Sequence, residues 1–274
     1  MNDIAILVNS CDAYSDLWPF FFRLLKKNWE NIESHNIYLN TETVSKYDAG
    51  LPITIINTRQ EGADQWGKRV INCLNHIKEN YVVLLMDDFF LRSALDDRQL
   101  QLCLDYFEKE PKSAVFYLTH VFKKTFPESV FEKFEQIPQY TNYRLNSGPS
   151  LWKKDKLIKY IEETDNPWAW EYFGTCRTNH TDDEFFCIKR ENTIYDYAHA
   201  IYRGRWLENE VKPLMDEFGL DIDLTKRGSI AETDAPPKRN IKWKISFLMT
   251  GIKMVGFDAI GEVFRDWKNA NSSE

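Results

Sequence analysis

The chain has 274 residues, of which 43% are hydrophobic and 15% aromatic, so it can bury a sizeable core in one large domain, with or without an appendage. The formal net charge of −7 argues against a general nucleic-acid-binding surface, and we expect no nucleic-acid partner. The five cysteines are scattered without a CxxC pair, which is typical of a reduced cytoplasmic protein and excludes a disulfide frame or a zinc site.

The first residues lack the features of a secretory signal. Asp3 falls where a basic n-region would be, and Ile4–Val8 is too short for an h-region. No stretch approaches the roughly 20 apolar residues of a membrane-spanning helix. We therefore expect a cytoplasmic protein, with the inner face of the cell membrane as the alternative location.

The first third of the chain alternates between predicted strands and predicted helices. Short apolar runs predict strands at Ile4–Val8, Ile37–Leu39 and Ile53–Ile56, and helical character predicts a helix over Leu17–Trp29. A second helix is predicted over Val70–Glu79, with apolar residues on one face. Repeated strand–helix–strand units indicate a mostly parallel sheet built from right-handed crossovers.

The middle and later parts continue this pattern less regularly. Apolar runs predict strands at Ala114–Leu118 and Thr193–Tyr197, whereas Phe122–Gln139 is predicted to be an irregular excursion over the sheet edge. Helices are expected over Arg98–Phe107, Trp152–Glu163 and Leu207–Phe218. The predicted fold class is therefore α/β: a mostly parallel, Rossmann-related sheet flanked by helices in residues 1–232, then a linker and a C-terminal helical appendage in residues 233–274.

Tyr81–Leu91 (YVVLLMDDFFL) is the stretch around which the rest is organised. Its continuous apolar run predicts a strand buried on both faces, and it leads into two adjacent carboxylates, Asp87 and Asp88. Ligands of open α/β sheets bind at the carboxyl ends of the strands, and Mg²⁺ or Mn²⁺ prefers carboxylate oxygens. The pair is a candidate metal–phosphate anchor; the alternative is a strand-end turn with solvated acids.

Gln60–Arg69 (QEGADQWGKR) is a polar loop that precedes a predicted helix. It contains Trp66 and the basic pair Lys68 and Arg69. Basic side chains beside a helix N-terminus suit an anionic ligand, so all three residues are candidates for binding such a ligand. Ordinary capping with solvated basic side chains is the alternative.

Pro167–Arg177 (PWAWEYFGTCR) surrounds one carboxylate, Glu171, with aromatic residues. Aromatic neighbours that exclude water raise the pKa of a carboxyl group, which makes Glu171 a candidate general base. Trp168 and Trp170 are candidate platforms for a sugar ring of an acceptor. The alternative is a helix start whose tryptophans pack into the core while Glu171 is solvated.

Three residues near residue 200 have side chains suited to a metal or a phosphate. His199 could complete a metal site with Asp87 and Asp88 or bond to a phosphate, although a structural role is the alternative. Arg203 and Arg205 flank Gly204 and suit phosphate oxygens.

The C-terminal segment is set apart by composition. Thr233–Asn240 has the composition of a linker, and Ile241–Trp267 is predicted to be helical with an apolar face and several lysines. This segment either docks on the core or a second subunit, or lies at a membrane surface and contacts anionic lipid head groups.

In combination these motifs resemble a bacterial glycosyltransferase of the GT-A type, in particular the small enzymes of capsule, O-antigen and other surface-polysaccharide synthesis. The resemblance rests on NSCDAY after the first strand, EGADQWGKR, VVLLMDDFFL, NSGPSLWKKDKL followed by NPWAWEYFG, and YRGRWL with a later Arg-Gly pair. It covers about Ile4 to Gly228.

The resemblance implies transfer of a sugar from a nucleotide-diphosphate donor to a saccharide or lipid-linked saccharide acceptor, with a divalent metal, Mn²⁺ or Mg²⁺, as cofactor. Asp87 and Asp88 would correspond to the family's acidic metal-binding motif, although here the two acids are adjacent. Asn9, Ser10 and Asp12 would lie near the base or ribose of the nucleotide. Glu171 would be the base of an inverting transfer, and His199 a late metal or phosphate ligand.

Two rival classes remain open. A nucleotidyltransferase would also place acids at a strand end, but it usually has a Gly-rich basic loop after the first strand, which Asn9–Asp16 lacks. A non-catalytic carbohydrate-binding protein could retain the same sheet. The sequence leaves open the donor sugar, the nucleotide base, the acceptor and the oligomeric state.

Overall fold

The structure is a computed structural model that describes residues 4–57, 65–126, 131, 133–231 and 240–271. In this part of the chain, the main sheet has eight strands in the order β3-β2-β1-β4-β8-β6-β9-β7. All strands run parallel except β8 and β7. The strands are β1 Ile4–Asn9, β2 Asn36–Thr41, β3 Ile53–Asn57, β4 Tyr81–Met86, β6 Ser113–Tyr117, β7 Phe134–Gln136, β8 Ser150–Lys153 and β9 Glu184–Ile188.

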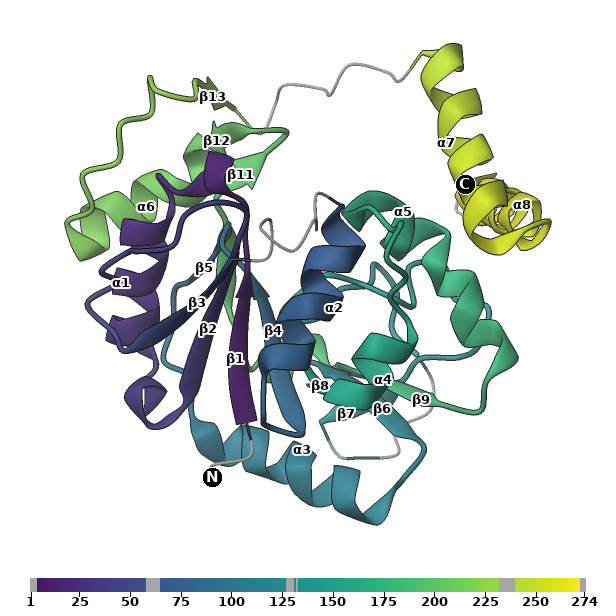
Figure 1. The fold of residues 1–274 in the computed structure, drawn as a ribbon, viewed down its shortest axis with the longest axis horizontal. Helices are drawn as coiled ribbons and strands as arrows, with labels where there is room; N and C mark the ends of the chain where they lie inside the picture. Colours follow the sequence, from purple (N-terminus) through teal and green to yellow (C-terminus); the bar gives the residue numbers. More distant parts are fainter. Residues whose placement is uncertain (1–3, 58–64, 127–130, 132, 232–239, 272–274) are drawn as a thin grey trace.

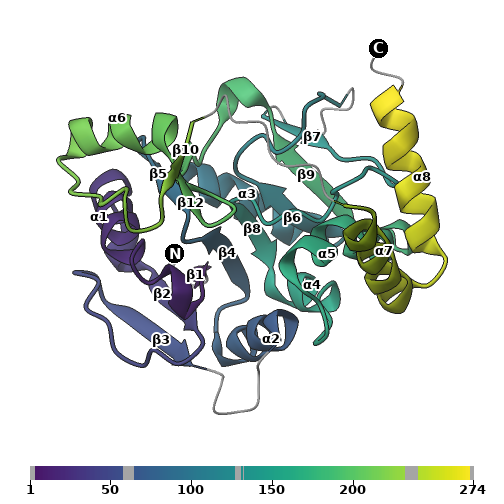
Figure 2. The same ribbon diagram turned by 90° about the horizontal axis from the view of Figure 1, so that it is seen from above.

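Helices cover both faces of this sheet (Figures 1 and 2). On one face lie α1 and α3, packed on alternate β1 residues such as Ile6, and on the other lie α2 and α4, packed on residues such as Leu7. Because both faces are covered, the central strands are apolar without alternation. The helices are α1 Trp18–Asn28, α2 Trp66–His76, α3 Asp97–Lys109, α4 Lys154–Lys159, α5 Pro167–Tyr172 and α6 Glu208–Phe218.

The predicted fold class is confirmed, since the protein is an α/β structure with a large, mostly parallel sheet flanked by helices. The predicted helix over Trp152–Glu163 is wrong at both ends, because α4 covers only Lys154–Lys159. Ser150–Lys153 forms β8, which lies antiparallel between β4 and β6. Leu151 and Trp152 are fully buried there, and a short apolar run does not by itself distinguish a strand from a buried helix.

Other differences concern short strands with distant partners. The strand β9 at Glu184–Ile188 was not predicted, and β7 lies at the sheet edge within the stretch predicted to be irregular. The strand predicted at Thr193–Tyr197 is displaced to β10, Tyr197–His199. There it pairs with β5, Phe89–Leu91, which follows the two aspartates.

A small three-stranded sheet lies beyond the carboxyl end of β1 (Figure 1). It contains β11 Ile201–Tyr202, β12 Arg205–Leu207 and β13 Ser229–Ile230. Between β12 and β13, α6 ends as predicted at Gly219, whose φ of 58° is the left-handed conformation typical of a helix C-terminus.

The C-terminal segment forms two helices where one helical segment was predicted. Helix α7, Ile241–Val255, and helix α8, Asp258–Asn271, are separated at Gly256, whose φ is 63°. The predicted linker at 233–239 lies outside the described residues. No helix in the described part of the chain is long and apolar enough to cross a membrane.

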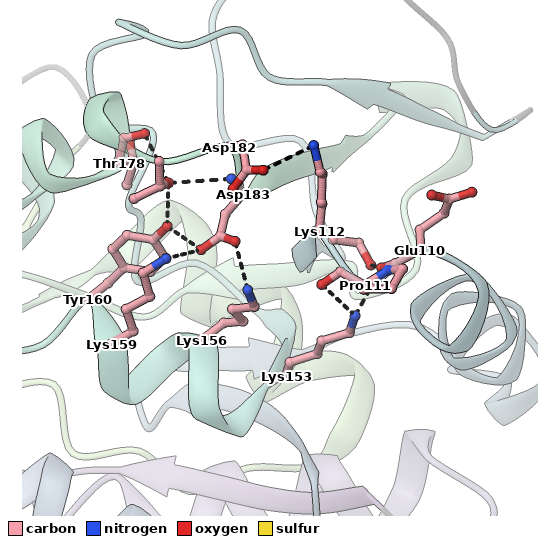
Figure 3. A network of polar contacts seen from close by, with 12 residues as sticks. Glu110, Pro111, Lys112, Lys153, Lys156, Lys159, Tyr160, Thr178, Asp182 and Asp183 are labelled. Carbon is pink, nitrogen blue, oxygen red and sulfur yellow. Dashed lines mark hydrogen bonds and ion pairs between the residues drawn. The ribbon is translucent and has the colours of Figure 1, made fainter.

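Figure 3 shows a polar network that joins Asp182 and Asp183, two adjacent residues just before β9, to side chains on and after α4 and to Lys112. The buried carboxylate of Asp183 accepts hydrogen bonds from Lys156 Nζ and Lys159 Nζ, both at 2.7 Å, and from the Tyr160 hydroxyl at 2.6 Å. The neighbouring Asp182 pairs with Lys112 at 3.0 Å in an exposed position. The two adjacent aspartates therefore occupy very different environments.

Candidate functional site

Asp87 follows β4 directly and points into the protein. It is buried, and its Oδ2 accepts hydrogen bonds from the Ser10 hydroxyl and from Trp18 Nε1, the latter at 3.1 Å. Burial, together with the charge of Asp88, raises the pKa of Asp87 to about 8. This carboxyl group ties the ends of β1 and β4 to α1, and a bound cation nearby would favour its charged form.

Asp88 is more accessible and lies beside His199. His199 Nε2 is 3.3 Å from Asp88 Oδ2, with side-chain exposures of 44% and 18% respectively. The pairing of β10 with β5 sets His199 opposite Phe89, and the Ala200 amide donates to the Asp88 carbonyl oxygen at 2.8 Å. The pairing of the two short strands therefore holds a carboxylate and an imidazole together at the open end of the sheet.

These residues fit a divalent cation only in part. No cluster of three or more His, Cys, Asp or Glu side chains that could hold a metal occurs among the described residues. Asp88 and His199 can supply two ligands, and Mg²⁺ commonly takes its remaining ligands from water and substrate phosphates. The expected three-ligand set is thus not assembled, because the buried Asp87 directs Oδ2 to Ser10 and Trp18.

Glu171 on α5 is the second acidic element of the site. Its Oε1 accepts hydrogen bonds from the Ser147 amide at 2.7 Å and the Ser147 hydroxyl at 2.5 Å. Burial raises the pKa of Glu171; the charge of Asp88 also raises it, while Ser147 and His199 lower it. The carboxylate is therefore within electrostatic range of the Asp88–His199 pair. Ser147 was not predicted as its partner, because nothing local to Ser147 in the sequence indicates a contact with Glu171.

The two tryptophans next to Glu171 have different surroundings. Trp168 is 71% exposed, whereas Trp170 is fully buried. Trp170 Nε1 donates to the Tyr160 carbonyl oxygen at 2.9 Å, and its ring lies 5.7 Å from that of Trp66. Trp170 therefore packs in the interior, and the partly buried Trp66 packs against it. The prediction of Trp170 as an acceptor platform is not supported, because its ring has no face open to a sugar.

The polar residues after β1 lie at the same open end of the sheet, but their polar atoms bond within the protein. Asn9 Oδ1 accepts from Asn40 Nδ2 at 2.7 Å. Asp12 accepts from the amides of Glu42 at 3.0 Å and Thr43 at 2.9 Å. Although burial opposes it, these contacts and the Thr43 hydroxyl lower the pKa of Asp12. Asp12 therefore fixes the loop after β2.

Helix α2 begins at Trp66, four residues before the predicted start, so Lys68 and Arg69 belong to its first turn. The amides of Gly67 and Lys68 donate to backbone carbonyl oxygens of Asp165 and Glu163 at 3.0 and 3.1 Å. The predicted anion at this helix N-terminus would need amides that point toward it. These two amides instead donate to backbone carbonyl oxygens. A Cβ at Gly67 would lie 2.0 Å from the Glu162 carbonyl oxygen, so a residue with a side chain would clash at this position. Residues 60–64 of the predicted loop lie outside the described residues.

Arg69 nevertheless remains a strong candidate for an anion. Its side chain is only 7% exposed and pairs with Glu42 Oε1 at 3.0 Å through Nη1. Its Nε is buried without a hydrogen-bond partner among the described residues. Its charge also acts on Cys11, at the turn after β1. A buried guanidinium with an unsatisfied donor beside the carboxyl ends of β1 and β2 suits an anionic ligand group.

Arg203 and Arg205 lie at the tight turn between β11 and β12, where Arg203 and Gly204 have φ values of 52° and 79°. Both side chains are exposed, and the Arg203 guanidinium lies 5.3 Å from the Tyr202 ring centroid. The turn lies beyond the carboxyl end of β1 (Figure 1). The predicted role of both arginines in binding phosphate oxygens stays a prediction.

Arg227 was not predicted as a site residue, although its Arg-Gly pair was noted in the sequence. Its Nε donates to Asp16 Oδ2 at 2.8 Å, and its guanidinium lies 4.6 Å from the centroid of the Tyr14 ring. The charge of Asp87 acts on Arg227 as well, since it contributes to the raised pKa of the guanidinium. Arg227 therefore connects the loop after α6 to the turn after β1, at the rim of the site.

Fold and site together define an α/β protein with a carboxylate–histidine pair and a partly buried glutamate at the carboxyl end of a mostly parallel sheet. Neither a protein-family model nor a curated protein matches the sequence.

Solved structures do show similarity to the chain. A cytidylyltransferase from Leptospira borgpetersenii is 15% identical, with 72% of this chain and 80% of that chain covered and a TM-score of 0.45. Residues 1–349 of S. aureus TarS in complex with UDP are 12% identical, with coverages of 83% and 68% and a TM-score of 0.44. Mouse xyloside xylosyltransferase 1 is 13% identical, with coverages of 58% and 69% and a TM-score of 0.35. At such low identities and scores the likeness concerns the fold and decides neither substrate nor reaction.

Proposed function

We propose that the protein is a glycosyltransferase that moves a sugar from a nucleotide-diphosphate donor to a saccharide or lipid-linked saccharide acceptor. The observation that carries the proposal is the Asp88–His199 pair at 3.3 Å, with the partly buried Glu171 within electrostatic range of Asp88. Such a transfer must stabilise a leaving diphosphate and deprotonate an acceptor hydroxyl. The site offers one group of residues for each requirement.

The donor side of the proposed site consists of Asp88, His199 and Arg69. Asp88 and His199 would hold Mn²⁺ or Mg²⁺, which when bound supplies positive charge to the leaving diphosphate. Arg69 would donate its unsatisfied Nε–H to an anionic donor group. Asp87 would support these residues indirectly, because it accepts hydrogen bonds from Ser10 and Trp18 and so fixes the end of β1.

The acceptor side of the proposed site consists of Glu171 and the exposed Trp168. With its raised pKa, Glu171 is a stronger base than an ordinary carboxylate, and it would take the proton of the attacking acceptor hydroxyl. A base on the acceptor predicts direct displacement and inversion at the anomeric carbon. Ser147 would hold the carboxylate in place during this step. The exposed ring of Trp168 can stack on a sugar face.

The resemblance of the sequence motifs to capsule and O-antigen enzymes supports a role in bacterial surface-polysaccharide synthesis. Such a role would place its action in the cytoplasm or at the inner face of the cell membrane. The donor sugar and the nucleotide base depend on pocket shape and are left to experiment.

The test is a panel of UDP- and GDP-sugars incubated with the protein, with and without Mn²⁺, and assayed for release of the nucleoside diphosphate. We expect slow, metal-dependent hydrolysis of one donor, faster turnover with an acceptor, and loss of turnover in Glu171→Gln with donor binding retained. Glu163→Gln, the same substitution at an exposed position, is the matched control and should behave as wild type.

Two outcomes would overturn the proposal in different ways. Pyrophosphate release from a nucleoside triphosphate and a sugar phosphate would identify a nucleotidyltransferase. Saccharide binding without hydrolysis of any donor would identify a non-catalytic carbohydrate-binding protein.

A further inference from the structure

The C-terminal helices expose a concentrated apolar surface. Of the thirteen exposed large hydrophobic side chains among the described residues, nine lie on α7, α8 and the turn between them. Phe257 is 86% exposed and Trp267 is 62% exposed. We call this surface the tail face; it comprises Ile241, Trp243, Ile245, Met249, Phe257, Ile260, Val263, Phe264 and Trp267. A concentration of exposed apolar side chains on two neighbouring helices marks an interaction surface.

The charged side chains of the same helices are distributed unevenly. The acids of α8 are directed to polar partners: Asp258 to His180 at 2.8 Å, Asp266 to the Tyr172 hydroxyl at 3.1 Å, and the buried Glu262 to Arg265 at 2.5 Å. The exposed charges around the tail face are mainly cationic, and they belong to Lys242, Lys244, Lys253 and Lys268. The rest of the chain is acidic, since the whole carries a net charge of −7.

The tail face has a fixed relation to the candidate site, because α7 packs on α5. The Phe247 ring lies 4.8 Å from the Phe173 ring and 5.7 Å from the Tyr172 ring. Gly251 of α7 lies against the Phe173 ring, where a Cβ would approach to 2.5 Å. Figures 1 and 2 both show the helix pair beside α5, at one end of the molecule. Helix α5 also carries Glu171.

We propose that the tail face docks on an anionic lipid bilayer, with the apolar side chains in the interfacial region and the lysines against the head groups. Exposed apolar side chains, tryptophan and phenylalanine among them, together with exposed lysines on the same two helices are typical of helices that lie in a membrane interface. Docking through α7 and α8 would hold α5 near the bilayer. If the proposed function is correct, this orientation presents the acceptor side of the site to a lipid-linked saccharide.

Charge favours a bilayer over a second copy of the chain. A symmetric dimer through the tail face would bring the lysines of two copies close together, and like charges in an interface are unfavourable. An anionic surface instead pairs each lysine with an opposite charge.

The experiment is co-sedimentation of the full chain with vesicles of phosphatidylcholine alone or mixed with phosphatidylglycerol. We expect binding to the anionic vesicles at least tenfold tighter than to the neutral ones, and weakened by added salt. Phe264→Ser and Trp267→Ser should each reduce binding at least tenfold. Leu102→Ser, at an exposed position on α3, is the matched control and should bind as wild type.

A second pair of variants tests the cationic part of the surface. Lys253→Gln should weaken binding to anionic vesicles about fivefold, as expected for one lysine at a charged membrane surface. Lys109→Gln, an exposed lysine at the end of α3, should leave binding unchanged. All of these side chains are exposed, so the variants should fold, which circular dichroism and thermal melting would verify.

Two results would overturn the proposal. One is equal, salt-independent binding to both vesicle types or no binding to either. The other is a dimer in solution that Phe264→Ser converts to a monomer, because a second copy would then cover the tail face. Vesicle binding by Glu171→Gln separates this proposal from the proposed function: we expect that variant to dock normally even where transfer is lost.

Discussion

The imidazole Nε2 of His199 lies 3.3 Å from Oδ2 of Asp88, although 111 residues separate the two along the chain. Three residue pairs between β5 and β10 produce this proximity, since they set His199 opposite Phe89 in an antiparallel ladder. The Phe89 ring also lies 5.4 Å from the imidazole and closes one side of it. The pairing of β5 with β10 therefore holds His199 beside Asp88, the residue directly before β5.

If His199 is a metal ligand, its loss should weaken the metal-dependent binding of a donor. We expect His199→Ala to reduce donor affinity at least tenfold in the presence of Mn²⁺ and to have little effect without it. Titration calorimetry with a nucleotide sugar would measure the difference. His76→Ala, at an exposed position on α2, should leave both affinities unchanged; equal losses with and without Mn²⁺ would contradict the assignment.

The Ser147 hydroxyl stabilises the charged form of Glu171 and so lowers its pKa, in opposition to burial. Removing it in Ser147→Ala should raise the pKa of Glu171 further. Because the base must be deprotonated to act, the acidic limb of the profile of kcat/KM against pH should move to higher pH. The measurement is a pH–rate profile, with Ser34→Ala as the control. An unmoved acidic limb would show that Glu171 is not the titrating base.

The adjacent aspartates in Figure 3 provide a matched pair for stability. Asp183→Asn breaks a buried ionic cluster and should cost about 3 kcal/mol in the free energy of unfolding. Asp182→Asn removes an exposed ion pair and should change it by less than about 0.5 kcal/mol. Urea denaturation of both variants would compare the two costs.

The Asp183 effect should depend on pH. Burial opposes ionisation, but Lys156, Lys159 and Tyr160 together lower the pKa of Asp183 below its ordinary value of 3.8. A depressed folded-state pKa contributes stability above the unfolded-state pKa, and that stability is lost as the pH falls through the folded-state value. The difference between wild type and Asp183→Asn should therefore be full near pH 7 and shrink below about pH 4. A difference that stays constant to low pH would contradict this.

Two helical glycines at the C-terminus should respond oppositely to the same substitution. At Gly251 a Cβ would approach the buried Phe173 ring to 2.5 Å, so Gly251→Ala should lower the melting temperature and loosen α7. At Gly261 the nearest atom would be 3.5 Å away, so Gly261→Ala should stabilise α8 by up to about 1 kcal/mol. Thermal melting and hydrogen exchange of α7 would compare them; an unchanged α7 in Gly251→Ala would contradict the packing.

Local sequence was sufficient to predict the first half of the fold. Each strand from β1 to β4 is a short apolar run, and the helices between them have one apolar face, so periodicity and length identify them. The acids at the end of β4 were predictable as site candidates for the same reason, because a buried strand in a parallel sheet ends at the edge where ligands bind.

Features that depend on contacts between residues far apart in the chain were set only by the tertiary structure. Ser150–Lys153 is a strand because it pairs antiparallel with both β4 and β6. Nothing local to the sequence SLWK indicates these partners. Ser147 meets Glu171 because the loop before β8 lies against α5. Trp170 is buried while Trp168 is exposed because α5 turns one face inward. Sequence patterns report each residue's own preference, whereas the environment of a side chain is set by groups that folding brings from elsewhere in the chain.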